Sequence, residues 1–358
     1  MVGTTYVHRE GRRFDLGCGR KPAPGSQQTI MHKGKNDVLF TVISLFFLCG
    51  HQHLALAQST READTPRTAM ELPPLEVVGM SPLPSAGLPP GKIPGNVQVA
   101  TDEDLYRHEA INLTDFMRRN LGSVFASETL ANPFQPDIIY RGFSASPVLG
   151  TPVGISVYQD SIRVNEPFGD VVNWDLIPRV AIASMELVPG SNPLFGLNTL
   201  GGALAVRTKS GISHPGTRAQ AYGGSFERWN FEGERGGSYK NFDWYFAGNV
   251  FEDGGFRRFS PSSVRQAFTK VGWENGTTDI DLTYTYADNE LTGNGAAPQS
   301  LLQQNRRAVY AHPEITRPAL QFFNLMLIHN FSDDWMLSGS AYFRNSSTRV
   351  LAGDVEVE

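Results

Sequence analysis

The side chains that most often perform chemistry are few in this sequence and widely spaced. Both cysteines, Cys18 and Cys49, precede residue 60. No nucleophile elbow, phosphate-binding loop or complete dinucleotide fingerprint occurs, and these are short motifs with a defined mechanism. The later histidines are isolated and more typical of structural side chains than of metal ligands; they are His108, His214, His312 and His329. The sequence therefore predicts no enzymatic activity, no cofactor and no metal site.

The composition indicates β-structure with many tight turns. The chain has 358 residues, with 36 glycines, 23 prolines and 11% aromatic residues. This combination excludes a coiled coil, a collagen and a helical membrane bundle. Lys and Arg number 31 against 36 Asp and Glu, for a net charge of -5. Because no basic run occurs, this balance argues against nucleic acid as a partner and against recognition of anionic lipid.

An export signal stands near the start of the chain. Lys33 and Lys35 precede the apolar run Val38–Cys49, and a small-residue site follows at Ala55–Ala57. This order is typical of a secretory signal peptide, and the run is too short to span a bilayer as a helix. We expect a non-native extension at residues 1–30, a true start at Met31, and a signal peptide at 31–57 cleaved between Ala57 and Gln58.

The next segment has the composition of a mobile tether. Residues 58–95 are rich in proline and poor in apolar side chains, as extended linkers are. One β-prone island interrupts them at Leu75-Glu76-Val77-Val78. Such an island is a candidate for adding a strand to the sheet edge of another protein. On the residues alone, a chance pair of valines explains it equally well.

Residues 96–210 have the pattern of a compact α/β unit. Acidic residues after Thr101 mark a helix start, and Leu113–Leu121 places apolar side chains on one helical face. Short strands then alternate with glycine and proline turns. We expect these strands at Ile138–Gly142, Gly154–Tyr158, Met185–Val188 and Ala203–Val206.

From about residue 217 the pattern changes to long strands with a period of two. Phe242 and Trp244 share one face, and Asp243 and Tyr245 share the other. Long strands with one apolar and one polar face are typical of a membrane β-barrel with a wet interior, whereas strands of a soluble sandwich are shorter. Short turns alternate with long loops at 252–263 and 289–317. The seven expected strands are 217–224, 227–236, 239–251, 264–273, 278–288, 318–331 and 335–347.

Three motifs resemble those of a known family. They are Asp137–Phe143, Ile155–Asp160 and Met185–Gly190, the last continued by Gly201–Lys209. Their order and spacing after a signal peptide resemble the plug of TonB-dependent outer-membrane receptors, over about residues 75 to 350. The resemblance implies an α+β plug domain at 96–210, followed by antiparallel transmembrane β-barrel strands over 217–358. It also implies that Leu75, Glu76, Val77 and Val78 form the TonB box.

The chain departs from this family in its extent. By resemblance, a full member has about 22 strands, whereas seven are expected here. The final residues, Asp354–Glu358, are charged and lack an aromatic terminal strand. We therefore expect a truncated product or fragment with an incomplete barrel, whose unpaired strand edges lipid does not tolerate. Smaller departures, Ser161 after Asp160 and Pro189 in the third motif, affect loop geometry.

Candidate site residues follow from the motifs and the resemblance. Arg141 and Glu186 stand between strand residues, and as buried charges they need ion-pair partners in the plug or on the barrel wall. By resemblance, ligand contacts lie in loops 144–153 and 164–175, where aromatic and amide groups suit a chelate. The alternative is that these side chains only order the loop. The ligand candidates are Phe168, Asp170, Asn173 and Trp174; the glycines expected to need positive φ or close backbone approach are Gly142, Gly190, Gly196, Gly201 and Gly202.

The resemblance implies an energy-coupled importer in the outer membrane of a Gram-negative bacterium. Its ligand would be a scarce metal chelate such as a ferric siderophore, and its partners would be TonB and outer-membrane lipid. One alternative is a related importer of cobalamin, a nickel chelate or an oligosaccharide. The other is a plug-bearing remnant that binds TonB or a surface ligand without transport.

Overall fold

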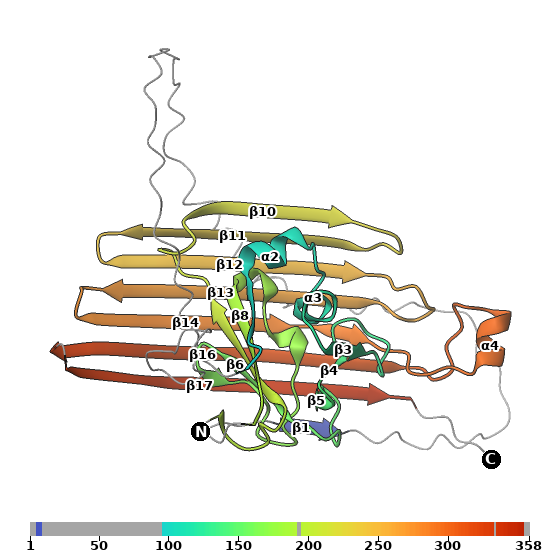
Figure 1. The fold of residues 1–358 in the computed structure, drawn as a ribbon. Helices are drawn as coiled ribbons and strands as arrows, with labels where there is room; N and C mark the ends of the chain where they lie inside the picture. Colours follow the sequence, from blue (N-terminus) through green and yellow to red (C-terminus); the bar gives the residue numbers. More distant parts are fainter. Residues whose placement is uncertain (1–4, 9–94, 192–194, 333, 354–358) are drawn as a thin grey trace, which may run out of the picture. The chain divides into compact units, whose positions relative to one another are not determined.

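Two regions make up the described chain, an α/β domain over residues 95–210 and a large sheet of long strands after it (Figure 1). The structure is a computed structural model that describes residues 5–8, 95–191, 195–332 and 334–353. The predicted signal peptide at 31–57 and the island at Leu75–Val78 lie outside the described residues.

Two small sheets build the α/β domain. Their strands are β2 (Gln98–Thr101), β3 (Val124–Ser127), β4 (Asp137–Tyr140), β5 (Phe143–Ala145), β6 (Ile155–Gln159), β7 (Ile162–Arg163), β8 (Ile182–Pro189) and β9 (Gly202–Thr208). One sheet has the order β2-β8-β9-β6-β7, and the other has the order β3-β4-β5. Only β6 and β9 pair parallel in these two sheets. The four strands expected in this region are all present.

Two helices belong to the α/β domain, α2 (Asp102–Arg107) and α3 (Leu113–Asn120). The hydroxyl of Thr101 accepts the main-chain N–H of Asp104, whose carboxylate accepts the Thr101 N–H in return. This capping box fixes the start of α2. The buried face of α3 is the predicted one, formed by Leu113, Phe116 and Met117. In the part of the chain that the structure describes, no helix has both the length and the apolar character needed to cross a bilayer.

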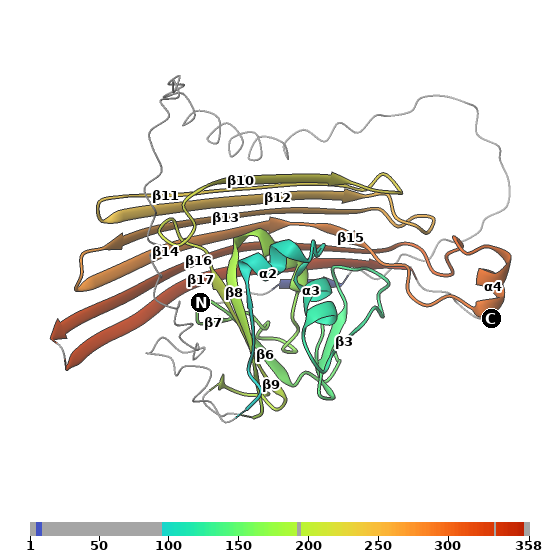
Figure 2. The ribbon, with the colours of Figure 1, turned by 45° about the horizontal axis from the view of Figure 1, so that its top comes forward.

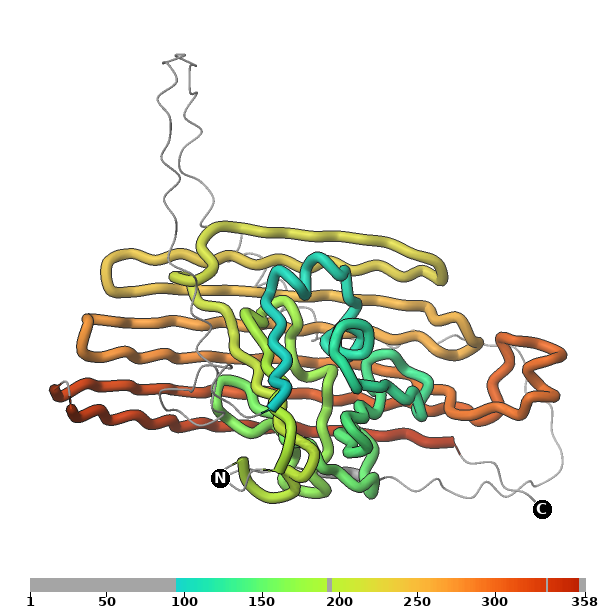
Figure 3. Tube along the Cα trace, viewed as in Figure 1, coloured from blue at the N-terminus to red at the C-terminus, as the bar shows by residue number. Residues whose placement is uncertain are grey.

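The large sheet contains all seven long strands expected from the sequence. They are β10 (Gly216–Gly223), β11 (Trp229–Tyr239), β12 (Phe242–Asp253), β13 (Ser262–Glu274), β14 (Thr278–Asp288), β16 (Glu314–Ser332) and β17 (Trp335–Ala352). Each pairs antiparallel with the next, in the order β17-β16-β14-β13-β12-β11-β10 (Figures 1 and 3).

Outside the α/β domain, three described short elements were not expected from the sequence. The loop expected at 289–317 contains β15 (Glu290–Thr292), which pairs with β13 and β16, and the helix α4 (Gln299–Gln304). β1 (Thr5–His8) falls in the segment expected to be a non-native extension, and it pairs parallel with β17. An element of three or four residues is too short to show a periodicity of its own.

The period-two pattern sorts the side chains of the large sheet between two faces. In β12, Asp243 and Tyr245 are 5% and 0% exposed, whereas Phe242 is 55% exposed. The buried face lies against the α/β domain, because Leu320 and Phe322 of β16 join the core cluster of that domain (Figure 2). The opposite face carries the exposed aromatic side chains, as the predicted alternation requires. A sheet with this polarity suits lipid on one side and polar contacts on the other.

Close backbone approach explains the paired glycines at the start of β9. A Cβ on Gly201 would lie 2.5 Å from Cβ of Phe143, and a Cβ on Gly202 would lie 2.4 Å from the carbonyl oxygen of Val188. Gly202 also has a φ of +153°, which favours glycine. The remaining three glycines expected to need this freedom have positive φ; they are Gly142, Gly190 and Gly196.

We expect Gly202→Ala to lower the free energy of unfolding of the α/β domain by about 2–4 kcal/mol, since the added Cβ meets fixed backbone. Gly122→Ala is the matched control, because its Cβ would meet only the end of the flexible Gln98 side chain, at 3.3 Å; its cost should stay below about 1 kcal/mol. Hydrogen exchange of β8 and β9 amides across a urea series measures both. Equal losses would contradict this role for Gly202.

Candidate ligand and partner site

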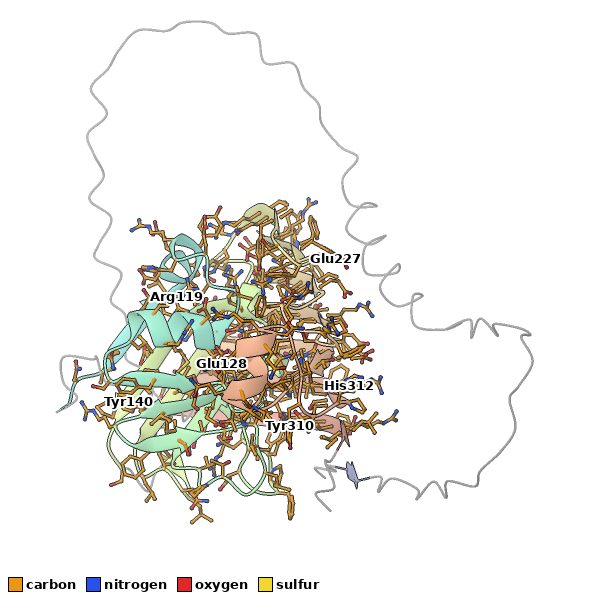
Figure 4. The ribbon with its side chains drawn as sticks, turned by 90° about the vertical axis from the view of Figure 1, so that its right-hand side faces the viewer. Arg119, Glu128, Tyr140, Glu227, Tyr310 and His312 are labelled. Atoms are coloured by element: carbon orange, nitrogen blue, oxygen red, sulfur yellow. The ribbon has the colours of Figure 1, made fainter. Side chains whose placement is uncertain are left out.

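The two ends of the large sheet differ in their connections. Short turns join β11 to β12, β13 to β14 and β16 to β17 at one end. The other end, which we call the long-loop end, carries the hairpin 224–228 and the loops 254–261 and 293–313. Figure 4 views this end: Glu227, Tyr310 and His312 lie on its loops, and Arg119, Glu128 and Tyr140 lie on the α/β domain.

The α/β domain reaches the long-loop end through residues 128–136. The Asn132 amide donates to the hydroxyl of Ser262 at 2.9 Å and to the carbonyl of Thr292 at 3.1 Å. Phe134 packs edge-on against Phe251, with ring centroids 4.9 Å apart. None of the residues in this loop was among the predicted site residues. The one sequence feature that marks this loop is the pair of prolines on either side of Phe134-Gln135.

A buried ion pair joins the α/β domain to β17. Glu166 and Arg344 have side chains 1% and 6% exposed. The two terminal nitrogens of Arg344 donate to the two carboxylate oxygens of Glu166 at 2.8 and 2.9 Å. Ser346 of β17 donates to the same carboxylate at 2.8 Å, and Asn173 donates at 3.3 Å. This bidentate geometry is the strongest form of a carboxylate–guanidinium contact.

A second buried carboxyl of the α/β domain, Asp175, lies against β13 and the residue after β14. It belongs to the 3-10 helix η2 (Trp174–Leu176). The Asn289 amide donates to the carboxylate of Asp175 and to its main-chain carbonyl, both at 2.8 Å, and the Gln266 amide donates to that carbonyl at 2.6 Å. Burial raises the pKa of Asp175 to about 7, and the negative charge of Glu166 adds to this rise, while the hydrogen bond from Asn289 opposes it.

Ion pairs with β11 hold the α/β domain at another place. Arg179 lies in η3 (Arg179–Ala181) and contacts the Glu232 carboxylate at 2.5 Å, and Lys209 contacts Glu234 at 2.5 Å. The Tyr245 hydroxyl donates to Glu234 at 2.6 Å. The Asp102 carboxylate lies 3.3 Å from His214, and the hydrogen bond between them lowers the pKa of Asp102. Charged groups of the two regions therefore meet in complementary pairs.

Comparison with known proteins identifies the α/β domain. Residues 89–203 match the family model described as TonB-dependent Receptor Plug Domain. Residues 89–203 therefore form a plug domain of the kind found in TonB-dependent receptors. The resemblance drawn from the sequence motifs is thereby confirmed. No curated protein matches the sequence.

Solved receptors share the fold of the plug and the large sheet. The ferric citrate transporter FecA, in its unliganded form, matches with a TM-score of 0.61 at 13% identity, over 73% of this chain and 41% of its own. FpvA from P. aeruginosa, in a complex with a heterologous pyoverdine and iron, gives 0.56 at 15% identity, over 73% and 35%. The ferric yersiniabactin uptake receptor FyuA from Yersinia pestis gives 0.57 at 13%, over 73% and 42%. This chain thus spans less than half the length of these receptors.

The structure separates the four ligand candidates of the plug into two kinds. Phe168 is 59% exposed, and Asp170 is half-buried and accepts a hydrogen bond from Arg163 at 3.2 Å. Trp174 and Asn173 are only 3% and 8% exposed. Trp174 packs in the plug core, and the Asn173 amide donates to Glu166. Contact of these two side chains with a ligand stays a prediction.

The two charges expected to be buried also differ. Glu186 of β8 is 1% exposed, as expected. Arg141 is exposed, with a φ of +51°, and its guanidinium lies 5.2 Å from the ring centroid of Tyr140. The expectation that Arg141 forms a buried ion pair is wrong, because Arg141 lies in the turn after β4 rather than within the strand.

Arginines gather on two joined loops of the long-loop end. Arg257 donates to the carbonyl of Ala308 at 3.1 Å, and Arg307 donates to the carbonyl of Phe256 at 3.0 Å. The rings of Phe259 and His312 stack with centroids 4.5 Å apart. Positive charge beside aromatic rings suits an anionic ligand with flat groups. We refer to Arg257, Arg258, Arg306 and Arg307 as the arginine loop cluster.

The described residues contain no group of His, Cys, Asp and Glu side chains that could hold a metal ion. The long-loop end presents arginine, amide and aromatic groups.

Removing one partner of a buried ion pair leaves an uncompensated charge. We expect Arg344→Gln to lower the free energy of unfolding of the plug by about 3–5 kcal/mol, and a double change with Glu166→Gln to cost less than Arg344→Gln alone. Arg317→Gln is the control, since Arg317 and Glu290 have side chains 47% and 46% exposed. Its loss should stay within about 1 kcal/mol. Pulse proteolysis across a urea series measures these losses in free energy, and equal effects of the two arginine changes would contradict this role for the Glu166–Arg344 pair.

Proposed function

We propose that the whole receptor imports a scarce metal chelate across the outer membrane, with a ferric siderophore as the first candidate. The observation that carries this proposal is a plug held by buried polar contacts on one face of a sheet whose other face is apolar. Three receptors of the same fold are named for ferric citrate, ferric yersiniabactin or a pyoverdine–iron complex. Because this chain spans 35% to 42% of those chains, the proposal concerns the whole receptor.

The polar character of the plug contact supports a moving plug. A side chain in an ion pair or an amide hydrogen bond can exchange its protein partner for water at a modest net cost in free energy. An apolar side chain that leaves a core for water has no such compensation. In the proposed cycle, a chelate binds at the long-loop end, and the plug then changes its contacts with the large sheet. The chelate shifts the plug only by as much as its affinities for the two plug states differ.

TonB is the proposed energy-coupling partner, through Leu75–Val78. A β-prone island in a proline-rich tether suits strand addition, in which main-chain hydrogen bonds provide the affinity. The predicted signal peptide at 31–57 and the apolar outward face of the large sheet support an outer-membrane location.

The arginine loop cluster supports an anionic chelate as the ligand. Complementary charge raises the rate of encounter and disfavours partners of the wrong sign. Cobalamin and oligosaccharides lack the net negative charge that this cluster would select. A panel of ligands separates these ligand classes, because only the true ligand should protect the loops of the long-loop end when it binds.

Uptake of radiolabelled chelates tests the proposal in a Gram-negative host that lacks its own ferric-chelate receptors and produces the full receptor. We expect uptake of at least one anionic ferric chelate, and its loss when the proton gradient is dissipated. Deleting residues 75–78 should abolish uptake and leave chelate binding at the cell surface unchanged, because the deleted segment acts only in energy coupling. Uptake that survives both treatments would contradict the proposal, as would binding without uptake by the unaltered receptor.

The double change Arg258→Gln and Arg306→Gln tests the ligand class. Both side chains are exposed on the loops of the long-loop end. We expect about a 10- to 100-fold loss of affinity for an anionic chelate, which shrinks as salt is added, since the attraction is electrostatic. Lys240→Gln, in the turn between β11 and β12 at the other end, should leave affinity unchanged. Binding titrations on whole cells measure both variants, and equal losses would refute the assignment.

A further inference from the structure

Two buried carboxyl groups of the plug lie in its contact with the large sheet, and an arginine binds one of them. Glu166 and Asp175 are each 1% exposed. Arg344 donates both of its terminal nitrogens to Glu166. Asp175 receives one side-chain hydrogen bond on its carboxylate, to Oδ2 from Asn289, and its own main-chain N–H also favours the ionised form. Its Oδ1 is buried and has no hydrogen-bond partner among the described residues.

The described side chains that contact or electrostatically affect Asp175 do not include a cation. β13 contributes Gln266, whose amide is used by the main-chain carbonyl of Asp175. The residue after β14 contributes Asn289, which is neutral, and the preceding plug loop contributes Glu166, which is negative. Arg344 of β17 is bound to Glu166. A carboxyl in such surroundings is favoured in its protonated form.

We propose that Asp175 is a proton-binding site in the contact between plug and large sheet, which seats the plug when protonated and loosens it when ionised. Four geometric observations support the proposal. The Asp175 carboxyl is fully buried, Asn289 is its one side-chain donor, its Oδ1 has no hydrogen-bond partner among the described residues, and the Glu166 carboxylate is a neighbour. The consequence for import rests on the proposed function. The seating of the plug does not, because it is measured without chelate and without TonB.

The direction of the pH dependence follows from the two states of Asp175. The seated plug holds its pKa at about 7, against 3.8 for an aspartate in water. The seated plug therefore binds the proton more tightly than the loosened plug. Seating is strongest below about pH 3.8, weakens by up to about tenfold per pH unit as the pH rises toward 7, and stays constant above it.

Hydrogen exchange of the full chain in detergent tests this site. At each pH, the exchange of peptides covering 164–176 is compared between the unaltered chain and Asp175→Asn, so that the intrinsic pH dependence of exchange cancels. We expect the opening constant of the unaltered chain to rise, relative to Asp175→Asn, by about 10- to 100-fold between about pH 5 and 7, and then to level off. Asp170→Asn is the matched control in the same loop, and it should keep the pH dependence of the unaltered chain.

A second measurement does not depend on the folding of Asp175→Asn. Infrared titration of the unaltered chain should show a protonated carboxyl band that disappears with a midpoint near pH 7. Asn289→Leu should move this midpoint upward, because it removes the hydrogen bond that favours the ionised form. The proposal is overturned if no protonated carboxyl titrates between about pH 5 and 8, or if Asp175→Asn leaves the exchange profile unchanged. Failure of chelate uptake with the exchange profile intact would refute the proposed function and leave the proton site standing.

Discussion

Buried charge between two packed layers is the constraint on which the rest of this structure depends. A long strand that presents apolar side chains to one side presents polar ones to the other. The plug covers the polar side of the large sheet, so Glu232, Glu234 and Arg344 lose their water. Charges removed from water need partners within reach. The plug supplies Arg179, Lys209 and Glu166 in the matching places.

Such an interface is better suited to separation than to maximum stability. Replacing a buried ion pair with well-packed apolar residues is often neutral or stabilising, so these pairs are weak evidence for strong adhesion. They do fix one register of the plug on the sheet, because a displaced plug would leave each charge facing the wrong neighbour. Glu166 illustrates this, since Arg344, Ser346 and Asn173 all converge on its two oxygens. The polar contacts that fix the position of the plug are therefore ones that water can replace, and they lie beside apolar contacts such as that of Phe134 with Phe251.

The sequence predicted the elements far better than it predicted the contacts. The period of two located all seven long strands, and β14 was predicted with its observed bounds, 278–288. Trp174 was expected at a loop tip, but it lies in the plug core. No sequence pattern predicted a role for Asn132, although it joins the plug to Ser262, which is 130 residues away in the sequence. Periodicity reports which face of an element is buried, whereas these errors concern which distant segments meet.

The order of strands in the plug decides which contacts a pull on its N-terminus would reach first. β2 is an edge strand that pairs with β8 over Gln98–Thr101, and Asp102 follows it directly. Four residue pairs of an edge strand form a weak first barrier, and the contact of Asp102 with His214 forms the next. Glu166 and Asp175 lie later in the plug, where they contact Arg344 of β17, Gln266 of β13 and Asn289 after β14. Under the proposed function, force would therefore act on the β2 edge, while ligand and protons would act on the contacts beyond it. The contacts that force would reach first and the contacts of Glu166 and Asp175 have no side chain in common. The response to force and the response to ligand and protons can therefore be set independently.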